Sequence, residues 1–252
     1  MAWFFALGAS MFLVLALVFA SHRSRPAWTV MDGLRVEVAY GNALPTEGGL
    51  SAATSSRSGP DRRLVALTFD DGPWPGQTDE VLRIFENQGA RATFFMVGDR
   101  ARAYPQLVRK VVGAGHLVGG HTLEHRRLAV LEPEEVRRQM VEGSNAITDV
   151  TGVAPTWFRP PYGAINRETM RQTQALGLRL AMWDIDTGDW RDPGVKKIVS
   201  RVMTEVENGS VIVLHDGGGD RRQTIAALPE IIRGLKERGY VLVTMQELAD
   251  AK

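Results

Sequence analysis

From residue 61 to residue 252, short apolar runs alternate with longer stretches in which apolar residues recur every three or four positions. The short runs are typical of buried β-strands and the longer stretches of amphipathic helices. We count about seven such strand–helix units, a pattern typical of a parallel sheet with helical connections. With this many units we predict an α/β fold, a closed or nearly closed (β/α) barrel. The expected strands are 64–69, 92–97, 117–118, one ending at 157–158, 178–183, 211–214 and 240–244, and the expected helices are 78–88, 104–114, 132–150, 167–176, 195–207 and 223–238.

The residues before this barrel divide into a hydrophobic segment and a linker. Residues 2–20 are almost entirely apolar and about long enough to span a bilayer, so we expect a signal peptide or membrane anchor over residues 1–25. Residues 26–60 contain a strand pattern at 34–40, which could form a hairpin with 28–31, and then a linker rich in Gly, Ser and Thr. We expect residues 61–252 to form the compact domain.

Composition excludes several classes of protein. The 30 basic and 29 acidic side chains leave a net charge of +1, so the chain has no electrostatic footprint for nucleic acid. The absence of cysteine excludes disulfides and thiolate metal sites. No further carbohydrate-binding repeat is visible, and no feature indicates a protein partner.

The strand predicted at 64–69 ends in two adjacent carboxylates, Asp70 and Asp71, followed by a turn signal. Adjacent residues of a strand point to opposite sides, so we expect the two carboxylates to have different roles. Taken alone, the pair could simply cap the next segment, because Asp-Gly turns are common. Polar clusters also follow other predicted strands, and in a barrel these loops share one rim. The clusters are 121–125, 159–163, 184–190 and 215–219.

Two histidines in the first cluster, His121 and His125, have a spacing that suits a metal site. Four residues apart, they would lie on one face of a helical turn, where both imidazoles can reach one ion. A carboxylate from another loop would complete the set and leave coordination positions open to water. The other clusters also have simpler interpretations: a proline-stiffened turn at 159–163, a helix cap at 186–189 and a flexible loop at 217–219.

Five short motifs, in order, resemble those of the polysaccharide deacetylases, the NodB-homology enzymes of carbohydrate esterase family four. They are Thr68-Phe-Asp-Asp-Gly-Pro73, His121-Thr-Leu-Glu-His125, Arg159-Pro-Pro-Tyr162, Asp186-Thr-Gly-Asp-Trp190 and Leu214-His215. The resemblance covers roughly residues 62–250. One departure is Arg126, where the family commonly has proline. Both histidines are intact, so this departure concerns the shape of the loop rather than the metal site.

The resemblance implies a distorted (β/α) barrel of about seven units that hydrolyses N-acetyl groups on a sugar polymer. Asp71, His121 and His125 would hold a divalent metal, zinc in the first place, with cobalt or another first-row metal as the alternative. Asp70 would be the general base for the water on that metal. His215 would be the general acid that protonates the leaving amine.

The same resemblance assigns supporting roles to five further residues. Tyr162 would contribute its backbone N–H to the oxyanion hole. Arg159 would orient the base, and Asp189 would orient the acid. Trp190 and Leu214 would line the small pocket for the acetyl methyl group.

Three alternative functions remain open on the sequence. The same groups could cleave O-acetyl esters on a xylan-like glycan, or the fold could bind glycan without catalysis. Two histidines and a carboxylate also occur in non-haem iron oxygenases. An oxygenase would have no use for Asp70 and His215, so we favour hydrolysis. The sequence does not choose between peptidoglycan, chitin-like oligomers and other N-acetylhexosamine polymers.

We expect an extracytoplasmic protein, secreted or anchored at the cell surface, because the implied substrate is a wall or extracellular glycan. The membrane would then be a partner through residues 1–25 if this segment is retained. Arg23 and Arg25 follow the apolar stretch and no basic residue precedes it. By the positive-inside rule this charge distribution favours the opposite orientation.

Overall fold

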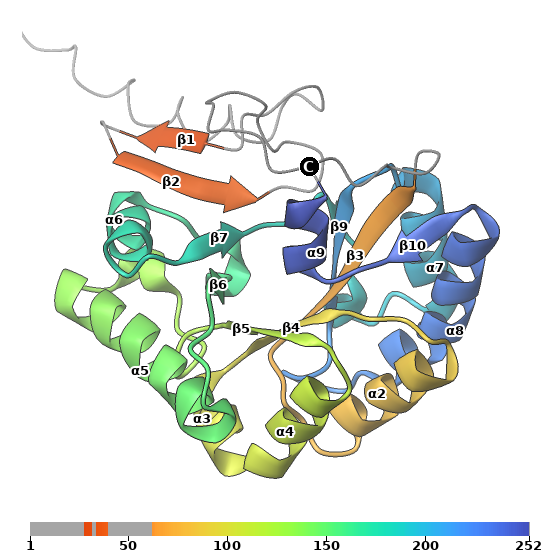
Figure 1. The fold of residues 1–252 in the computed structure, drawn as a ribbon, viewed down its shortest axis with the longest axis horizontal. Coiled ribbons are helices and arrows are strands. Elements are labelled where there is room, and N and C mark those ends of the chain that lie inside the picture. The colour runs from red at the N-terminus through yellow and green to blue at the C-terminus, as the bar shows by residue number, and fades with distance from the viewer. Residues whose placement is uncertain (1–27, 32–33, 40–61, 252) are drawn as a thin grey trace, which may run out of the picture.

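The computed structural model describes residues 28–31, 34–39 and 62–251 (Figure 1). The apolar stretch at 2–20 and the linker at 46–60 lie outside these residues. No helix in the described part is both long and apolar enough to cross a membrane. The division into 1–25, 26–60 and 61–252 therefore stays a prediction.

One ten-stranded sheet curls into an open barrel, in the order β1-β2-β7-β6-β5-β4-β3-β9-β8, with β10 also paired to β3 (Figure 1). Every pairing is parallel except that of β1 with β2. The strands are β1 Trp28–Met31, β2 Leu34–Ala39, β3 Arg63–Asp70, β4 Thr93–Met96, β5 Leu117–Gly120, β6 Trp157–Phe158, β7 Arg179–Ala181, β8 Ile185–Asp186, β9 Ser210–His215 and β10 Tyr240–Leu242.

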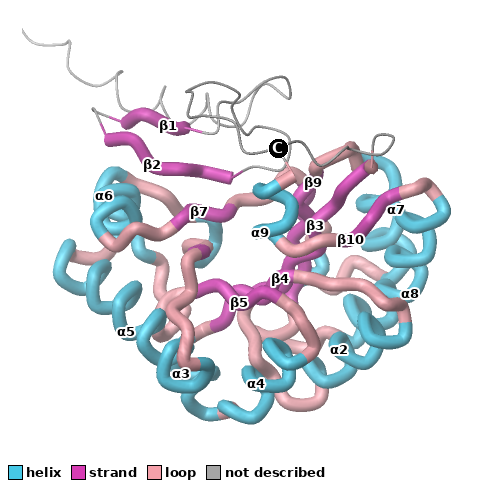
Figure 2. Tube along the Cα trace, viewed as in Figure 1, coloured by secondary structure: helices cyan, strands magenta, loops and turns pink. Residues whose placement is uncertain are grey.

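Helices connect the strands, and all except α9 lie on the outside of the sheet (Figure 2). They are α2 Gln77–Asn87, α3 Gly98–Ala103, α4 Pro105–Gly113, α5 Pro133–Thr151, α6 Arg167–Ala175, α7 Val195–Glu205, α8 Arg222–Glu237 and α9 Met245–Asp250, with short 3-10 turns at Leu128–Val130, Pro161–Gly163 and Asp189–Arg191. Pro133 begins α5 and Gly152 ends it in a left-handed conformation, as helix-terminus preferences lead one to expect.

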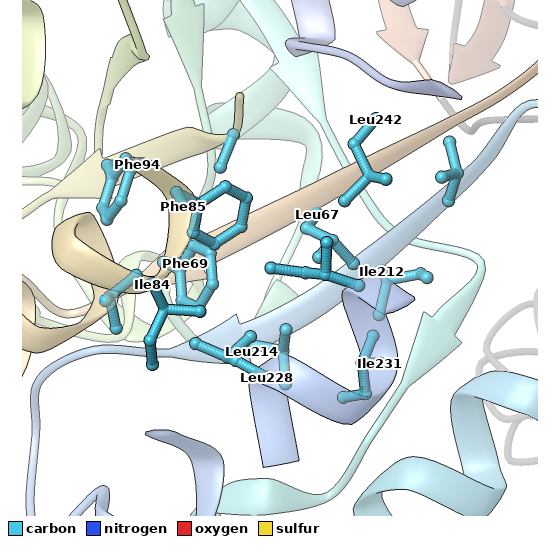
Figure 3. Packing of buried hydrophobic residues seen from close by; sticks show 14 of the residues in the cluster. Leu67, Phe69, Ile84, Phe85, Phe94, Ile212, Leu214, Leu228, Ile231 and Leu242 are labelled. Atoms are coloured by element: carbon cyan, nitrogen blue, oxygen red, sulfur yellow. The ribbon is translucent and has the colours of Figure 1, made fainter. Parts of the chain in front are cut away.

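The central strand β3 is buried on both faces, which explains its largely apolar sequence from Leu64 to Phe69. Phe69 faces outward and lies against Phe85 and Phe94, with ring centroids 5.7 and 5.1 Å away (Figure 3). The alternate residue Ala66 faces inward, in a cluster that includes Leu248 of α9. Met245, at the start of α9, donates its backbone N–H to Thr93 at the start of β4. Helix α9 thus covers the amino ends of the strands and leaves their carboxyl ends for a site.

The predicted fold class is confirmed, with differences at the barrel seam and in short elements. Among the described strands, β8 is not paired with β7, so the sheet stays open there. The expected hairpin is present as β1 and β2, and β2 extends the sheet beside β7. We did not predict α3, β8 or α9. Each has only two to six residues, too few for a clear apolar period.

Candidate active site

A pocket of about 770 Å³ opens at the carboxyl ends of the strands. Its lining includes seven of the ten predicted site residues: Asp70, Asp71, His121, His125, Tyr162, Trp190 and His215. Arg159 and Asp189 are buried and contact the predicted base and acid. Leu214 is the predicted residue that the structure places elsewhere. The pocket therefore lies where the polar clusters after the strands predict it, at the carboxyl ends of the strands.

Asp71, His121 and His125 form the potential metal-ligating group, with one ligand atom from each residue within 4.8 Å of the others. The Nε2 atoms of His121 and His125 lie 3.4 and 3.0 Å from Oδ1 of Asp71. Burial raises the pKa of Asp71, but the two imidazoles outweigh burial and hold its pKa well below the usual range. An ionised carboxylate between two imidazole nitrogens fits a divalent cation.

A hydrogen bond orients His121 for this role. Its Nδ1 lies 2.7 Å from the backbone carbonyl oxygen of Arg159. A carbonyl oxygen can only accept, so Nδ1 carries the hydrogen and the lone pair is left on Nε2, which faces Asp71. Metal-ligating histidines are commonly fixed through the second nitrogen in this way. This hydrogen bond thus fixes the tautomer of His121 in which Nε2 is free to bind a metal.

His121 and His125 do not lie on a helical turn, so the predicted helical geometry of the pair is wrong. Residues 121–125 form a loop, with Thr122 at φ 66° and His125 at φ 59°, in the left-handed region. Neighbouring elements fix the loop: the backbone N–H groups of Gly98 and Asp99 donate to the carbonyl oxygens of Thr122 and Leu123, both at 2.9 Å. These bonds compensate for backbone conformations that are costly for residues other than glycine.

Gly143 of α5 allows the helix to lie directly against this loop. A Cβ atom at position 143 would fall 2.6 Å from the backbone carbon of Thr122 and 2.7 Å from its oxygen. We therefore expect Gly143→Ala to lower the free energy of unfolding by about 1–3 kcal/mol, through overpacking. It should also weaken metal binding, because the displaced backbone carries His121 and His125.

Urea unfolding and metal titration would measure both effects. Gly113→Ala is a matched control, because Gly113 also lies in a helix and its added Cβ would meet nothing within 4 Å. The explanation is refuted if Gly143→Ala is as stable as Gly113→Ala and binds metal equally well.

Asp70 is fixed by a fully buried arginine. Arg159 donates through Nη1 to Oδ1 of Asp70 at 2.8 Å and to Thr68 at 2.7 Å. It also donates to the backbone carbonyl oxygens of Ala181 and Met182. Burial lowers the pKa of the Arg159 guanidinium, and the charge and hydrogen bond of Asp70 oppose that shift. The predicted contact between Arg159 and Asp70 is present in the structure.

His215 is bound on one side by Asp189, as expected. Its Nδ1 lies 2.7 Å from Oδ1 of Asp189, and Oδ2 accepts hydrogen bonds from the His215 backbone N–H and from Thr224 Oγ1, both at 2.8 Å. Burial lowers the pKa of His215, but the hydrogen bond and charge of Asp189, helped by Asp70 and Asp71, outweigh burial and raise it to about 9. His215 is therefore protonated at neutral pH.

The acetyl-pocket prediction for Leu214 is not supported by the structure. Leu214 is fully buried in the outer core beside α8, whereas its neighbour Val213 lines the pocket. Alternate residues of a strand share a face, so His215 and Val213 point to the same side of β9. Trp190 lines the pocket with 46% of its surface exposed, and Trp183 contributes a second indole.

Asp216 is a fully buried carboxyl group that the sequence did not indicate as part of the site. Asp216 accepts a hydrogen bond from Thr78 at 2.5 Å, and Thr78 in turn accepts one from the backbone N–H of Trp74. Burial, opposed by the Thr78 hydrogen bond and helped by the charges of Asp71 and Asp70, raises the pKa of Asp216 to about 7. This network joins the loop and helix that follow β3 to the loop that follows β9, the strand paired with β3.

The residues 217–219, interpreted on the sequence as a flexible loop, instead lie close to Asp71. A Cβ atom at Gly218 would fall 2.3 Å from Oδ2 of Asp71, and Gly218 has φ 70°. Only glycine permits both the backbone conformation and the close approach. The loop therefore helps to hold Asp71 in place.

The pocket thus combines a carboxylate held by arginine, an imidazolium held by aspartate and a group suited to a divalent cation. At the rim of a (β/α) barrel, these groups define the site of a metal-assisted hydrolase.

Comparisons with known proteins identify the family. The family model for polysaccharide deacetylase matches residues 57–181. The chain is 38% identical over 190 residues to a peptidoglycan-N-acetylglucosamine deacetylase of Bacillus cereus, covering 75% of this chain and 89% of that protein. It is 37% identical over 205 residues to a chitooligosaccharide deacetylase of Sinorhizobium fredii, covering 77% and 95%. The structure of peptidoglycan deacetylase PdaC from Bacillus subtilis matches with a TM-score of 0.71 and 37% identity, over 77% of this chain and 93% of that one.

The chain therefore belongs to the polysaccharide deacetylase family. The predictions of the family, of its barrel fold and of an enzyme that hydrolyses N-acetyl groups on glycans are confirmed.

Proposed function

We propose that this deacetylase acts on an N-acetylglucosamine-type wall or chitin-like polymer and uses a divalent metal held by Asp71, His121 and His125. The observation that supports this most directly is the placement of Asp70 and His215, each with its own buried partner, in one pocket with the metal-ligating group. An amide is a poor electrophile with a poor leaving group, so its hydrolysis needs both a base and an acid.

Asp70 is the general base in this proposal. Arg159 occupies Oδ1 of Asp70, which leaves Oδ2 to accept a proton from the water that attacks the acetyl carbon. The fixed guanidinium also holds the carboxylate in one orientation. Thr68 and the backbone carbonyl groups bound to Arg159 keep it from turning away.

His215 is the general acid. Since Asp189 binds Nδ1, the nitrogen left for the substrate is Nε2, and its proton passes to the amide nitrogen as the carbon–nitrogen bond breaks. The products are acetate and a free amine. The backbone N–H of Tyr162 is the proposed donor to the oxyanion, in a turn where Tyr162 has φ 62°. Val213, Trp183 and Trp190 are the proposed walls around the acetyl methyl group.

The residues present fit a metal. A divalent cation bound by Asp71, His121 and His125 would polarise the acetyl carbonyl and lower the pKa of the attacking water. Two imidazoles and one carboxylate suit zinc, and we propose zinc as the native ion, with cobalt or another first-row metal as the alternative.

The substrate proposal comes from relatives whose names specify peptidoglycan N-acetylglucosamine, peptidoglycan N-acetylmuramic acid and chito-oligosaccharides. The chain spans 40% of the muramic acid deacetylase PdaC. Acetate release by the purified full chain from peptidoglycan fragments, chito-oligomers and acetylated xylan would test the proposal. Release from xylan alone would replace it with O-acetyl ester hydrolysis, and release from none would indicate a silent glycan-binding domain.

We also propose that the catalytic domain lies outside the cytoplasm, secreted or anchored by residues 1–25. The apolar stretch at 2–20 and the extracellular nature of the proposed substrates support this location. A reporter fused after Lys252 should be active on the outer side of the membrane or in the medium. Activity confined to the cytoplasm would refute the proposal.

A further inference from the structure

Three arginines line the pocket, and two of them stack on aromatic rings. Arg100, on α3, lies 3.9 Å from the ring centroid of Trp74 and 4.8 Å from that of Tyr104. Arg127, on the loop after β5, lies 4.6 Å from the ring centroid of Tyr162. Stacking restrains the plane of a guanidinium and leaves the N–H donors at its edge available to a ligand.

Neither of these arginines forms an ion pair with the residues that the structure describes, and the buried Nε of Arg100 has no hydrogen-bond partner there. Many other surface arginines of this chain do pair, often with a carboxylate one helical turn away. Examples are Arg83 with Glu80, Arg171 with Glu168 and Arg201 with Glu205. Arg100 and Arg127 thus carry positive charge that no described carboxylate balances with an ion pair.

Most carboxylates around the pocket already have cationic partners. Asp70 pairs with Arg159, Asp99 with Arg102 and Glu124 with Arg138. Asp186 stands on β8, beyond β9 in the sheet order, whereas Arg100 and Arg127 follow β4 and β5. The two arginines therefore lie on the side of the pocket that carries His121 and His125, away from Asp186.

We infer that Arg100 and Arg127 bind a carboxylate carried by a sugar next to the one that is deacetylated, so that the preferred substrate is an acidic amino-sugar polymer. This inference rests on the proposed function and narrows its substrate class. A guanidinium edge donates two parallel hydrogen bonds to a carboxylate, a geometry that neutral hydroxyl groups do not match. The acid can be an ether-linked lactyl group on the sugar or the terminus of an attached peptide, and both present the same chemistry.

The test compares soluble oligomers of equal length that alternate N-acetylglucosamine with its lactyl ether. In one the lactyl carboxyl is free, in the second it is a primary amide, and in the third it carries a dipeptide with a free terminus. The measured quantity is the ratio of kcat/KM for each acid to kcat/KM for the amide. We expect the parent ratio to be at least ~10 for one of the acids and to fall as salt increases. The acid with the larger ratio identifies the source of the carboxylate.

The variants Arg100→Gln and Arg127→Gln should lower this ratio, and together bring it close to one. Arg127→Lys, which keeps the charge, should retain most of it. Arg233→Gln removes one exposed charge from α8 outside the pocket and should leave the ratio unchanged. A parent ratio of one, or a ratio that the double variant does not lower, overturns the inference. If the parent releases no acetate from any of these oligomers, the proposed function itself fails.

Discussion

Replacing Asp71 with alanine should abolish both metal binding and acetate release, whereas Asp70→Asn should keep the metal and lose only turnover. Asp71 supplies the carboxylate of the metal-ligating group, and metal-ion catalysis contributes several kcal/mol, so a loss of at least ~10³-fold in kcat is expected. Asp70 instead faces Arg159, and losing a general base typically costs ~10²–10⁴-fold. The measurements are metal content of the purified variants and kcat on one soluble oligomer.

A chelator should reproduce the Asp71→Ala result in the parent protein, and zinc or cobalt should restore acetate release. In Asp71→Ala the added ions should restore little. Full activity in metal-stripped parent protein would contradict the proposed metal dependence. Equal loss of metal from both variants would show that Asp70 and Asp71 do not have separate roles as general base and metal ligand.

The position of the site could be predicted from the sequence because it depends on local features. The sequence shows an apolar strand that ends in two carboxylates, and it shows polar clusters after the other predicted strands. Parallel strands bring their carboxyl ends to one rim, so the clusters converge whatever the details of the helices. The pocket lined by Asp70, His125 and His215 follows from this geometry.

The shape of the histidine loop could not be predicted in the same way. A spacing of four suits a helical turn, but it also suits a loop that is held by distant backbone groups. Thr122 and His125 adopt positive φ angles that their residue types rarely adopt, and hydrogen bonds from α3 together with the close approach of Gly143 hold them there. Such contacts join residues that are far apart in the sequence.

Leu214 faces the outer core, opposite to the pocket. Strand alternation in β9 places Val213 on the same face as His215, so the pocket residue lies two positions before the histidine. By contrast, the Thr78–Asp216 hydrogen bond joins residues that only the finished barrel brings together.

Replacing His215 with alanine should reduce kcat by ~10²–10⁴-fold while leaving metal content unchanged, because it removes the proposed acid but no ligand. In the parent protein, kcat against pH should be bell-shaped. Asp70 must be ionised and His215 protonated, so activity falls at alkaline pH as His215 loses its proton near its pKa of about 9. The rate profile on one soluble oligomer would show this limb directly.

The variant Asp189→Asn should move that alkaline limb toward lower pH by ~1–3 units. Burial lowers the pKa of His215, and the hydrogen bond and charge of Asp189 are the main effects that oppose burial. A neutral amide removes the charge and weakens the hydrogen bond, so the imidazole loses its proton at lower pH. Thr224→Val is the matched control: it removes one hydrogen bond to Asp189 but keeps the carboxylate, which should then hold the His215 proton at least as strongly. The alkaline limb should therefore stay in place or move slightly upward in Thr224→Val. An alkaline limb that does not move in Asp189→Asn, with metal content and melting temperature unchanged, would show that Asp189 positions the ring without setting its charge.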